Sequence, residues 1–581
     1  MNRYILITAL ALLTIPALAQ HDEQVTVEGK YRPKVNKVDK LKLNPETPEQ
    51  TYMMPSTEVY PKEAKQKFAL DLEKIAPTGF ASKNDKLVTP TKNFLLAGIG
   101  TNLSPVFLYK HNSKLGRDFG LGVGVKHNSS WLNIKDYAPS GFMNNAFDVS
   151  LTTSILDGFQ IDAGVNYKND MYHYYGLNLT ELPVTLTEEQ IAEACPRQTY
   201  NTIGAHLGLA STSTRVGELR HSGTVDYHHT FDKFDAKEHF VGLEYGLGYA
   251  QNWWGDKSHP QKVGVDVGFQ YEYFDATQQD AANMAVVCRN DLYLIKVNPY
   301  FEMGGEFYKL HLGVRLDGVN CIKNEDKFLA VRPDINGSLY VLNKKLEFYA
   351  GLNGGRSLTT FSNVIAENPF VCNQLELLAP NVKFGFEAGV RTNVAEIVDV
   401  HLGVRYRNTD NDPLYQQRAV VLFSPITPET TLPIWNSYEL IYDTTRLLTV
   451  MADVRVKLRN SLTADVGFAY NSCKPTTEAY VWYRPTTEGK LKLTYDINDS
   501  WAVNAAFLYQ GGRYAKVFTS DGYKSEKMKD VFDLSLGADY KVSDQLTAFA
   551  LIDNVACQKY QLYYNYPVTG IQLFAGVKLK F

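Results

Sequence analysis

The chain has 581 residues, with 59 Lys and Arg, 63 Asp and Glu, a formal net charge of -4 and a mean hydropathy of -0.25. This near-neutral charge excludes the strong basic excess of a nucleic-acid-binding protein, so we expect no nucleic-acid partner. The 37 Tyr, 29 Phe and 41 Gly are spread along the chain, and beyond the N-terminus no apolar run approaches the ~20 residues of a membrane-spanning helix.

Residues 1–19 have the pattern of a secretory signal peptide. Arg3 supplies a positive charge, an apolar run follows, and small residues precede Gln20. This pattern predicts cleavage between Ala19 and Gln20. An uncleaved N-terminal membrane anchor is the alternative, but Pro16 interrupts the apolar run, which is shorter than a spanning helix.

Residues 20–92 form one compositional block that is rich in Lys, Glu and Pro. Such a segment buries too little apolar surface to offset the entropy of an ordered chain, and its prolines interrupt long elements. We predict an extended or disordered periplasmic arm, which would contact a periplasmic or lipoprotein partner. A small folded domain is the alternative interpretation.

From Asn93 to the end, apolar and polar residues alternate. Residues 462–470 read "LTADVGFAY" and residues 398–408 read "VDVHLGVRYRN", with apolar residues at every second position. A helix cannot use a period of two, so residues 93–581 are predicted to be strands.

Three features separate a membrane barrel from a soluble sandwich here. The predicted strands are longer than the ~5–6 residues usual in soluble sheets, their polar faces carry charges of both signs, and their apolar faces end in aromatic residues, as in outer-membrane barrels. Short turns also alternate with long connections, as in such barrels. The long connections are expected at 178–198, 280–290, 360–382 and 408–437.

The sequence therefore predicts an all-β protein: a transmembrane antiparallel up-and-down barrel in a Gram-negative outer membrane. Counting back from the C-terminus gives about 22 strands, with 20 as the lower alternative, because bacterial single-chain barrels have even strand numbers. The first segment, "NFLLAGIGTNLSPVFLYKHN", is either one kinked strand or two. Splitting it gives the count of 22.

The last strand, "LFAGVKLKF", is predicted to close the barrel, because an open sheet edge in lipid would leave backbone groups unpaired. Its lipid-facing residues are expected to be Leu573, Ala575, Val577, Leu579 and Phe581. A terminal aromatic residue on such a strand resembles the targeting signal that the barrel-assembly machinery reads. That machinery and outer-membrane lipid are therefore expected partners.

The passages at residues 93–136 and "YKNDMYHYYGL" at 167–177 resemble the opening of the barrel in TonB-dependent-receptor-like outer-membrane proteins. "VTVEGKYRPKV" at 25–35 is faintly similar to a segment that precedes receptor plugs. The resemblance implies a receptor-like barrel. A plug needs an ordinary domain's worth of chain, so residues 20–92 are too short for a full plug domain.

Charged residues at alternate positions are expected to line the lumen. The main interpretation is a ladder of ion pairs that stiffens the wall; a pore lining that selects solutes by charge is the alternative. The candidates are Glu387, Arg391, Asp399, Arg405, Arg407, Asp453, Arg455, Lys457, Asp465 and Asp539.

Motifs of catalysis are absent from the sequence. No HExxH, GxSxG or Walker pattern occurs, so we expect no enzymatic activity, no cofactor and no metal. The run "GLGVGV" at 120–125 alternates as a strand does, with its glycines facing inward. His228 and His229 are adjacent and would face opposite sides of a strand, so they cannot share a metal.

The six cysteines follow no metal-binding spacing. On the predicted topology each lies at the outer end of a strand or in an outer loop, where exported thiols form disulfides; the alternative is that some are free, buried small hydrophobes. The candidates are Cys195, Cys288, Cys321, Cys372, Cys473 and Cys557.

Three functions remain open from the sequence. The first is a receptor-like barrel that binds or translocates a substrate together with partner proteins. The second is a non-transporting structural or assembly subunit of an outer-membrane complex. The third is a passive diffusion porin, for which a shorter arm and an open lumen would be expected.

Overall fold

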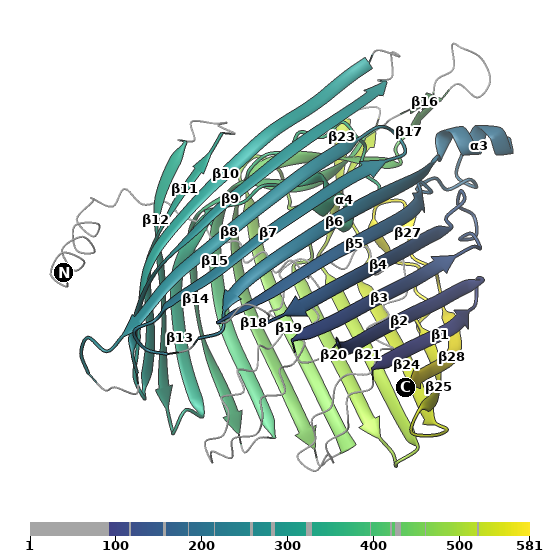
Figure 1. Cartoon of the computed structure of the whole chain (residues 1–581). Helices are drawn as coiled ribbons and strands as arrows, with labels where there is room; N and C mark the ends of the chain where they lie inside the picture. Colours follow the sequence, from purple (N-terminus) through teal and green to yellow (C-terminus); the bar gives the residue numbers. More distant parts are fainter. Residues whose placement is uncertain are drawn as a thin grey trace.

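Twenty-two antiparallel strands form one barrel in the computed structural model (Figure 1). The structure describes residues 92–581 except 116–117, 155–157, 184, 214, 256–258, 280–284, 321–327, 395–396, 419–420, 424–431, 459–460 and 520–521. The predicted signal peptide and periplasmic arm therefore lie outside the described residues.

The wall strands follow one another around the barrel in chain order. They are β1 (Asn93–Gly100), β2 (Ser104–Leu115), β3 (Phe119–Ser130), β4 (Phe142–Thr153), β5 (Phe159–His173), β6 (Arg197–Ser211), β7 (Leu219–Asp232), β8 (Lys237–Gln251), β9 (Gln261–Gln279), β10 (Ala285–Gly304), β11 (Tyr308–Val319), β12 (Leu329–Val341), β13 (Leu346–Arg356), β14 (Asn381–Val394), β15 (Val398–Arg418), β18 (Ser437–Leu458), β19 (Leu462–Pro475), β20 (Thr487–Asp496), β21 (Trp501–Gly511), β24 (Val531–Lys541), β25 (Leu546–Asp553) and β28 (Gln572–Lys580).

Smaller elements lie in the connections at one end of the barrel. They are α3 (Glu188–Ala194), α4 (Phe361–Glu367), β16 (Val421–Phe423), β17 (Leu432–Ile434), β22 (Tyr514–Thr519), β23 (Gly522–Lys527), β26 (Gln561–Tyr563) and β27 (Tyr566–Pro567). Neither of these two helices has the length and apolar character needed to cross a bilayer.

The first and last strands close the barrel. β1 and β28 pair from Phe94 opposite Lys580 to Gly100 opposite Phe574, and Asn93 exchanges backbone hydrogen bonds with Phe581 at 2.8 and 3.1 Å. The prediction of a C-terminal closing strand in a 22-strand barrel is confirmed. The ambiguous first segment is two strands, because β1 and β2 pair as a hairpin around residues 101–103.

The two ends of the barrel differ as predicted. The chain enters and leaves at the end with short turns, and the longer connections with α3 and α4 gather at the other (Figure 1). We call the latter the outer end, since bacterial barrels have short periplasmic turns and long outer loops.

Two of the four expected long connections are shorter than predicted. β10 begins at Ala285, so most of 280–290 is strand, and β15 continues to Arg418, so the connection expected at 408–437 is 419–436. Both strands continue past the region in which apolar and polar residues alternate. They remain strands there because their backbones still pair with a neighbouring strand.

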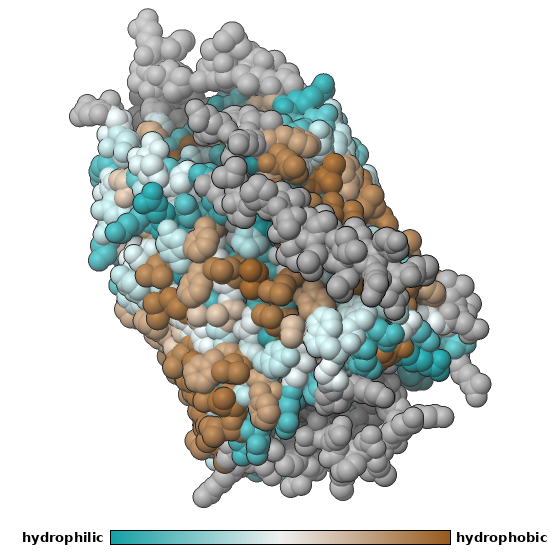
Figure 2. Space-filling model, turned by 90° about the vertical axis from the view of Figure 1, so that its left-hand side faces the viewer, coloured by the Kyte–Doolittle hydropathy of each residue, from teal (hydrophilic) through white to brown (hydrophobic). Residues whose placement is uncertain are grey.

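The outer surface of the wall is apolar, and Figure 2 shows large hydrophobic patches on one side of it. Leu402 on β15 is 50% exposed, whereas its neighbour Asp399 on the lumenal face is buried. On β28, Leu573, Val577 and Phe581 are exposed, while Phe574 and Lys578 are buried on the inner side. A soluble protein rarely exposes so much continuous apolar surface, so this band faces lipid.

Candidate functional site

The predicted charges line the lumen, and several of them meet across neighbouring strands. Arg405 on β15 pairs with Glu387 on β14 at 3.4 Å, and Arg455 on β18 pairs with Asp465 on β19. The other predicted charges make contacts that sequence reasoning did not identify or lie in the same lumenal rows. Arg391 pairs with Glu347, Asp453 with His401, Asp539 with Lys578, and Asp399 accepts from Asn393, while Arg407 and Lys457 lie on β15 and β18.

Two of these charged side chains are partly exposed among the described residues. The side chain of Arg391 is 50% exposed and that of Asp465 is 35% exposed. Exposed ion pairs of this kind contribute only about 0–1 kcal/mol each, so their main effect is to present charges of both signs to whatever enters.

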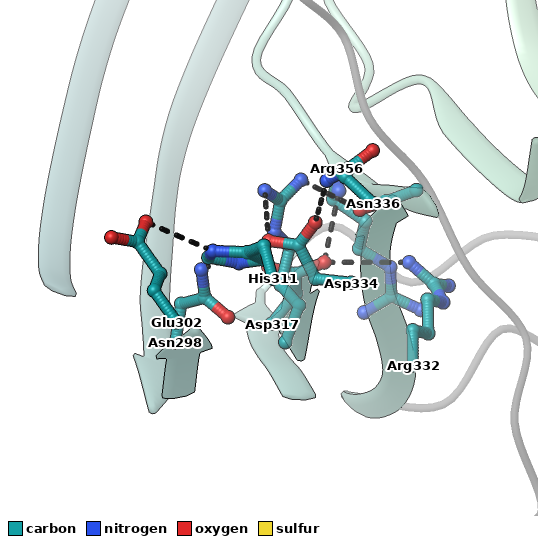
Figure 3. Close-up of polar contacts among 10 residues, drawn as sticks. Asn298, Glu302, His311, Asp317, Arg332, Asp334, Asn336 and Arg356 are labelled. Atoms are coloured by element: carbon teal, nitrogen blue, oxygen red, sulfur yellow. Dashed lines mark hydrogen bonds and ion pairs between the residues drawn. The ribbon is translucent and has the colours of Figure 1, made fainter. Parts of the chain in front are cut away.

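A more deeply buried polar cluster lies on the wall formed by β10 to β14 (Figure 3). Arg332 Nη1 lies 3.4 Å from Asp317 Oδ2, and both side chains are almost completely buried. Arg332 Nη2 also donates to Asn381 Oδ1 at 2.6 Å, and the backbone N–H of Arg356 donates to Asp317 at 3.0 Å. Asp317 thus holds the last residue of β13, where the connection 357–380 begins.

A second part of the cluster lies beside the first, to its left in Figure 3. His311 lies between two carboxylates, with Nδ1 at 3.2 Å from Glu302 and Nε2 at 3.7 Å from Asp334. Asp334 is also 3.4 Å from Arg315 Nη2 and accepts from Asn298 at 3.0 Å. These contacts tie β10, β11 and β12 together on the lumenal side.

The outer mouth is crossed by a packed aromatic core. It is built from the outer connections 174–196, 357–380, 476–486, 512–530 and 554–571 and from the upper ends of β6, β9, β15 and β18. We call this assembly the outer cap. Phe370 is central, since its ring stacks on Tyr566 at 3.7 Å and meets Tyr172 and Tyr175 edge-on.

Tyrosine suits this core because its ring is apolar and its hydroxyl can satisfy a backbone carbonyl. Tyr175 donates to the carbonyl of Pro567 at 2.8 Å, Tyr200 to that of Pro369 at 2.9 Å, and Tyr438 to that of Tyr564 at 2.8 Å. Each bond joins segments more than 100 residues apart, so the connections are held to one another as well as to the wall.

The segment 357–380 also contacts β8 and β9, which lie several strands away from β13 around the wall. At the start of α4, the backbone N–H of Ser362 donates to Glu238 on β8 at 3.1 Å, and that of Phe361 donates to Glu272 on β9 at 3.2 Å. Ser362 Oγ lies 3.0 Å from His228 Nε2. The prediction that His228 and His229 face opposite sides holds, because His229 stacks on His239, a residue of the outer face of β8.

Burial in the outer cap changes the ionisation of several side chains. It raises the pKa of the Cys195 thiol to about 12 and that of Cys372 to about 11. It also lowers the pKa of Arg513 to about 10, while that guanidinium donates to the carbonyls of Leu562 and Lys529. At neutral pH the two thiols are therefore protonated and unreactive.

The predicted disulfides are not formed among the cysteines that the structure describes. Cys195, Cys288, Cys372, Cys473 and Cys557 all lie on the outer side, yet none of these five is bonded to another. The prediction is wrong for pairs among them, and Cys321 lies outside the described residues.

The physical reason is that the buried thiols pack as small groups with their own neighbours. The amide of Asn436 donates to Cys195 at 3.6 Å, and Cys372 donates to the carbonyl of Gln374 at 3.8 Å. Cys288 also lies on β10 rather than inside a long connection as predicted.

Within the described part of the chain, no group of three His, Cys, Asp or Glu residues is arranged to hold a metal ion. The glycines at 120–125 face inward on β3, where Asp148 of the next strand occupies the space beside Gly124 and Ser150 the space beside Gly122. They leave room for these neighbouring side chains and form no phosphate-binding loop.

No protein-family model and no curated protein sequence matches the chain. Solved structures do match. FpvA of P. aeruginosa, solved with bound pyoverdines, has a TM-score of 0.60 and 13% identity over 85% of this chain and 72% of its own. The siderophore receptor PirA of Acinetobacter baumannii has a TM-score of 0.61 and 12% identity over 86% and 81% of the two chains. The fold is that of TonB-dependent receptors.

The copper transporter OprC is also similar, with a TM-score of 0.56 and 12% identity over 87% of this chain and 82% of its own. The predicted receptor-like outer-membrane barrel is therefore confirmed at the level of the fold. The prediction that a full plug is lacking concerns residues outside the described part and stays a prediction.

Proposed function

We propose that the chain is a receptor-like outer-membrane barrel that binds a substrate at its outer side and translocates it together with partner proteins. The observation that supports this proposal is the outer cap, which crosses the mouth above a water-accessible lumen lined by charges of both signs. A capped lumen suits regulated passage better than free diffusion. The similar solved structures include siderophore receptors and a copper transporter.

Planar-bilayer recording distinguishes a barrel that the cap keeps closed from an open diffusion porin. Purified wild-type protein should give no stable large conductance, whereas a variant with residues 361–378 replaced by a short Gly-Ser linker should conduct steadily. The matched control replaces residues 497–500, the short turn between β20 and β21 at the other end of the barrel, by Gly and Ser. A stable open conductance of the wild type would contradict regulated passage and favour the porin.

Removal of the predicted periplasmic arm tests whether that arm binds a partner protein. The full-length chain, purified in mild detergent from its native membrane, should bring a periplasmic or lipoprotein partner with it. A variant that keeps residues 1–19 but lacks 20–91 should assemble in the membrane and lose that partner. Retention of every co-purifying protein by the shortened chain would place the contact elsewhere.

The structural-subunit alternative is favoured by the same cap, because a lumen crossed by packed side chains also suits a barrel that transports nothing. The two functions differ in whether the cap must move. A co-purified small molecule that is retained by the wild type and lost from the linker variant supports the receptor. A stable protein complex that is unchanged by the linker variant and carries no small molecule supports the subunit.

A further inference from the structure

A row of polar side chains crosses the outer surface of the wall from β3 to β6. His127 Nδ1 lies 2.7 Å from Asn145 Oδ1, the Asn145 amide donates to Asn169 Oδ1 at 3.3 Å, and the Asn169 amide donates to Asn201 Oδ1 at 2.8 Å. Tyr167 also donates to Asn201, at 2.8 Å. We call His127, Asn145, Asn169 and Asn201 the amide row.

The amide row faces away from the lumen. Residues two positions along the same strands are exposed and apolar or aromatic, with Phe147 43%, Tyr167 40% and Ile203 49% exposed, and Val165, two positions further along β5, is 54% exposed. The adjacent lumenal position, Tyr200, is only 1% exposed. The row therefore marks the upper edge of the lipid-facing band, at the level of lipid headgroups.

The row keeps hydrogen-bonding capacity for a ligand. An asparagine amide carries two N–H groups, and the row uses one from Asn145, one from Asn169 and none from Asn201. Polar groups at a lipid-facing surface are costly unless they are hydrogen-bonded. The remaining N–H groups therefore suit hydroxyl or carbonyl oxygens of a headgroup.

Exposed cations lie directly above the row. Arg197 begins β6 on the same outward face as Asn201, about 13 Å away at ~3.3 Å per residue. Lys233 Nζ donates to the backbone carbonyl of Arg197 at 3.4 Å, and Lys237 begins β8 across the tight turn. All three side chains are exposed. The acids beside them are the exposed Asp235 and the buried Asp232 of the same turn, and Asp275 of β9, which lies opposite Lys237.

We propose that this face of β3 to β8, whose strands lie side by side in Figure 1, binds a phosphorylated glycolipid of the outer leaflet. Acyl chains lie on the apolar band around Val165 and Ile203, sugar hydroxyls accept from and donate to the amide row, and a phosphate meets Arg197, Lys233 and Lys237. Clustered basic side chains beside a bilayer attract anionic headgroups. The continuity of cation, amide and apolar surface fits one amphipathic lipid, whereas a free anion would use the cations alone.

Native mass spectrometry on the detergent-purified full chain tests this proposal, with bisphosphorylated lipid A as the probe. The triple variant Arg197→Gln, Lys233→Gln, Lys237→Gln should bind the probe at least tenfold more weakly than the wild type. Asn169→Leu with Asn201→Leu, which removes the amides but keeps the cations, should weaken binding about three- to tenfold. The matched control, Arg215→Gln with Lys541→Gln, removes exposed cations at the opposite rim and should bind as the wild type does.

Further measurements separate the lipid from other ligands. Phosphatidylcholine should bind the wild type and the triple variant equally. Inorganic phosphate at a hundredfold excess should not displace lipid A; displacement would reduce the site to an anion site and overturn the proposal. Equal lipid A binding by the wild type and the triple variant would also overturn it. So would a photo-crosslinker at residue 201 that captures a protein in native membranes instead of lipid.

Discussion

Replacing Phe370 by alanine should open the outer cap without dismantling the barrel. Phe370 is 1% exposed and its ring contacts Tyr172, Tyr175 and Tyr566. A buried Phe→Ala change costs about 3–5 kcal/mol, because it removes apolar burial and leaves a cavity. The wall strands keep all their backbone pairs, so this cost falls on the cap.

The expected size of the effect follows from the opening equilibrium. A loss of about 4 kcal/mol, at 1.36 kcal/mol per factor of ten, raises the open population about a thousandfold. Cys372 reports on this opening because it lies two residues from Phe370 and is 3% exposed. Local opening exposes a buried group in proportion to the open population, so labelling of Cys372 by a maleimide should accelerate by a similar factor.

The assay is mass spectrometry of the Cys372 peptide after timed labelling of purified protein. Phe348→Ala is the control, since Phe348 is 44% exposed on the lipid face; a surface change of this kind should alter the rate by no more than about twofold. Phe370→Leu covers the case in which the alanine variant fails to assemble. If folded Phe370→Ala protein labels Cys372 at the wild-type rate, the cap is not a unit that opens locally.

Three further predictions concern the closing strand β28 and the thiols of the outer side. Lys578 lies 2.6 Å from Asp539, and leaving one inward charge unpaired costs more than removing both charges. Lys578→Ala should therefore lower the thermal unfolding midpoint in detergent more than the double variant Lys578→Ala, Asp539→Ala does. Additive losses from the two single variants would contradict this. A membrane-impermeant maleimide on intact cells should label exposed Cys557 within minutes and buried Cys195 far more slowly; similar rates would refute the packing. Protease resistance of the cap should fall between pH 9 and 12, because the pKa of Cys195 is raised from 9.0 to about 12: the folded state keeps a proton that the unfolded state loses, so stability present below pH 9 is lost as the pH rises. Cys195→Ala should reduce this dependence without abolishing it, because burial raises the pKa of Cys372 as well; resistance that increases with pH would contradict the sign.

The wall could be predicted from the sequence because each of its residues obeys one local rule. Apolar residues such as Leu402 and Leu573 face lipid and alternate with inward residues such as Asp399 and Lys578. This period of two needs no knowledge of distant contacts, and the closing pair of Asn93 and Phe581 follows once the sheet must have no edge in lipid.

The alternation of lipid-facing and inward residues no longer predicts strands above the membrane. β10 continues upward to Ala285 and β15 to Arg418, where the inner face packs on the cap and the outer face meets water. Alternation of apolar and polar residues then no longer marks the strand, so the sequence pattern predicts loops at these strand ends. Local rules still apply at α3, which begins with a capping box in which Thr187 and Gln190 satisfy each other's backbone N–H groups within one turn.

The outer cap could not be predicted, since its contacts join residues that are distant in the chain. Tyr175 and Pro567, for example, are 392 positions apart. One signal was available: the aromatic run 560–566, "YQLYYNY", lies in a connection, where exposed rings would be costly. The disulfide prediction failed for a related reason, because a shared outer location says nothing about which thiols meet.

The division between wall and cap limits how anything can pass through the protein. Separating two wall strands in lipid would leave backbone groups unpaired at several kcal/mol each, so the wall cannot open at an acceptable cost. Besides the packing of Phe370 in the cap, the segment 357–380 has two polar attachments to the wall: Asp317 at its root beside Arg356, and Glu238 and Glu272 on β8 and β9. Those contacts are single hydrogen bonds of about 0.5–1.5 kcal/mol, or up to about 3 with a charged acceptor. Passage through the barrel therefore requires this segment to move, and side chains at its two attachments control that motion more directly than any residue of the lipid-facing band.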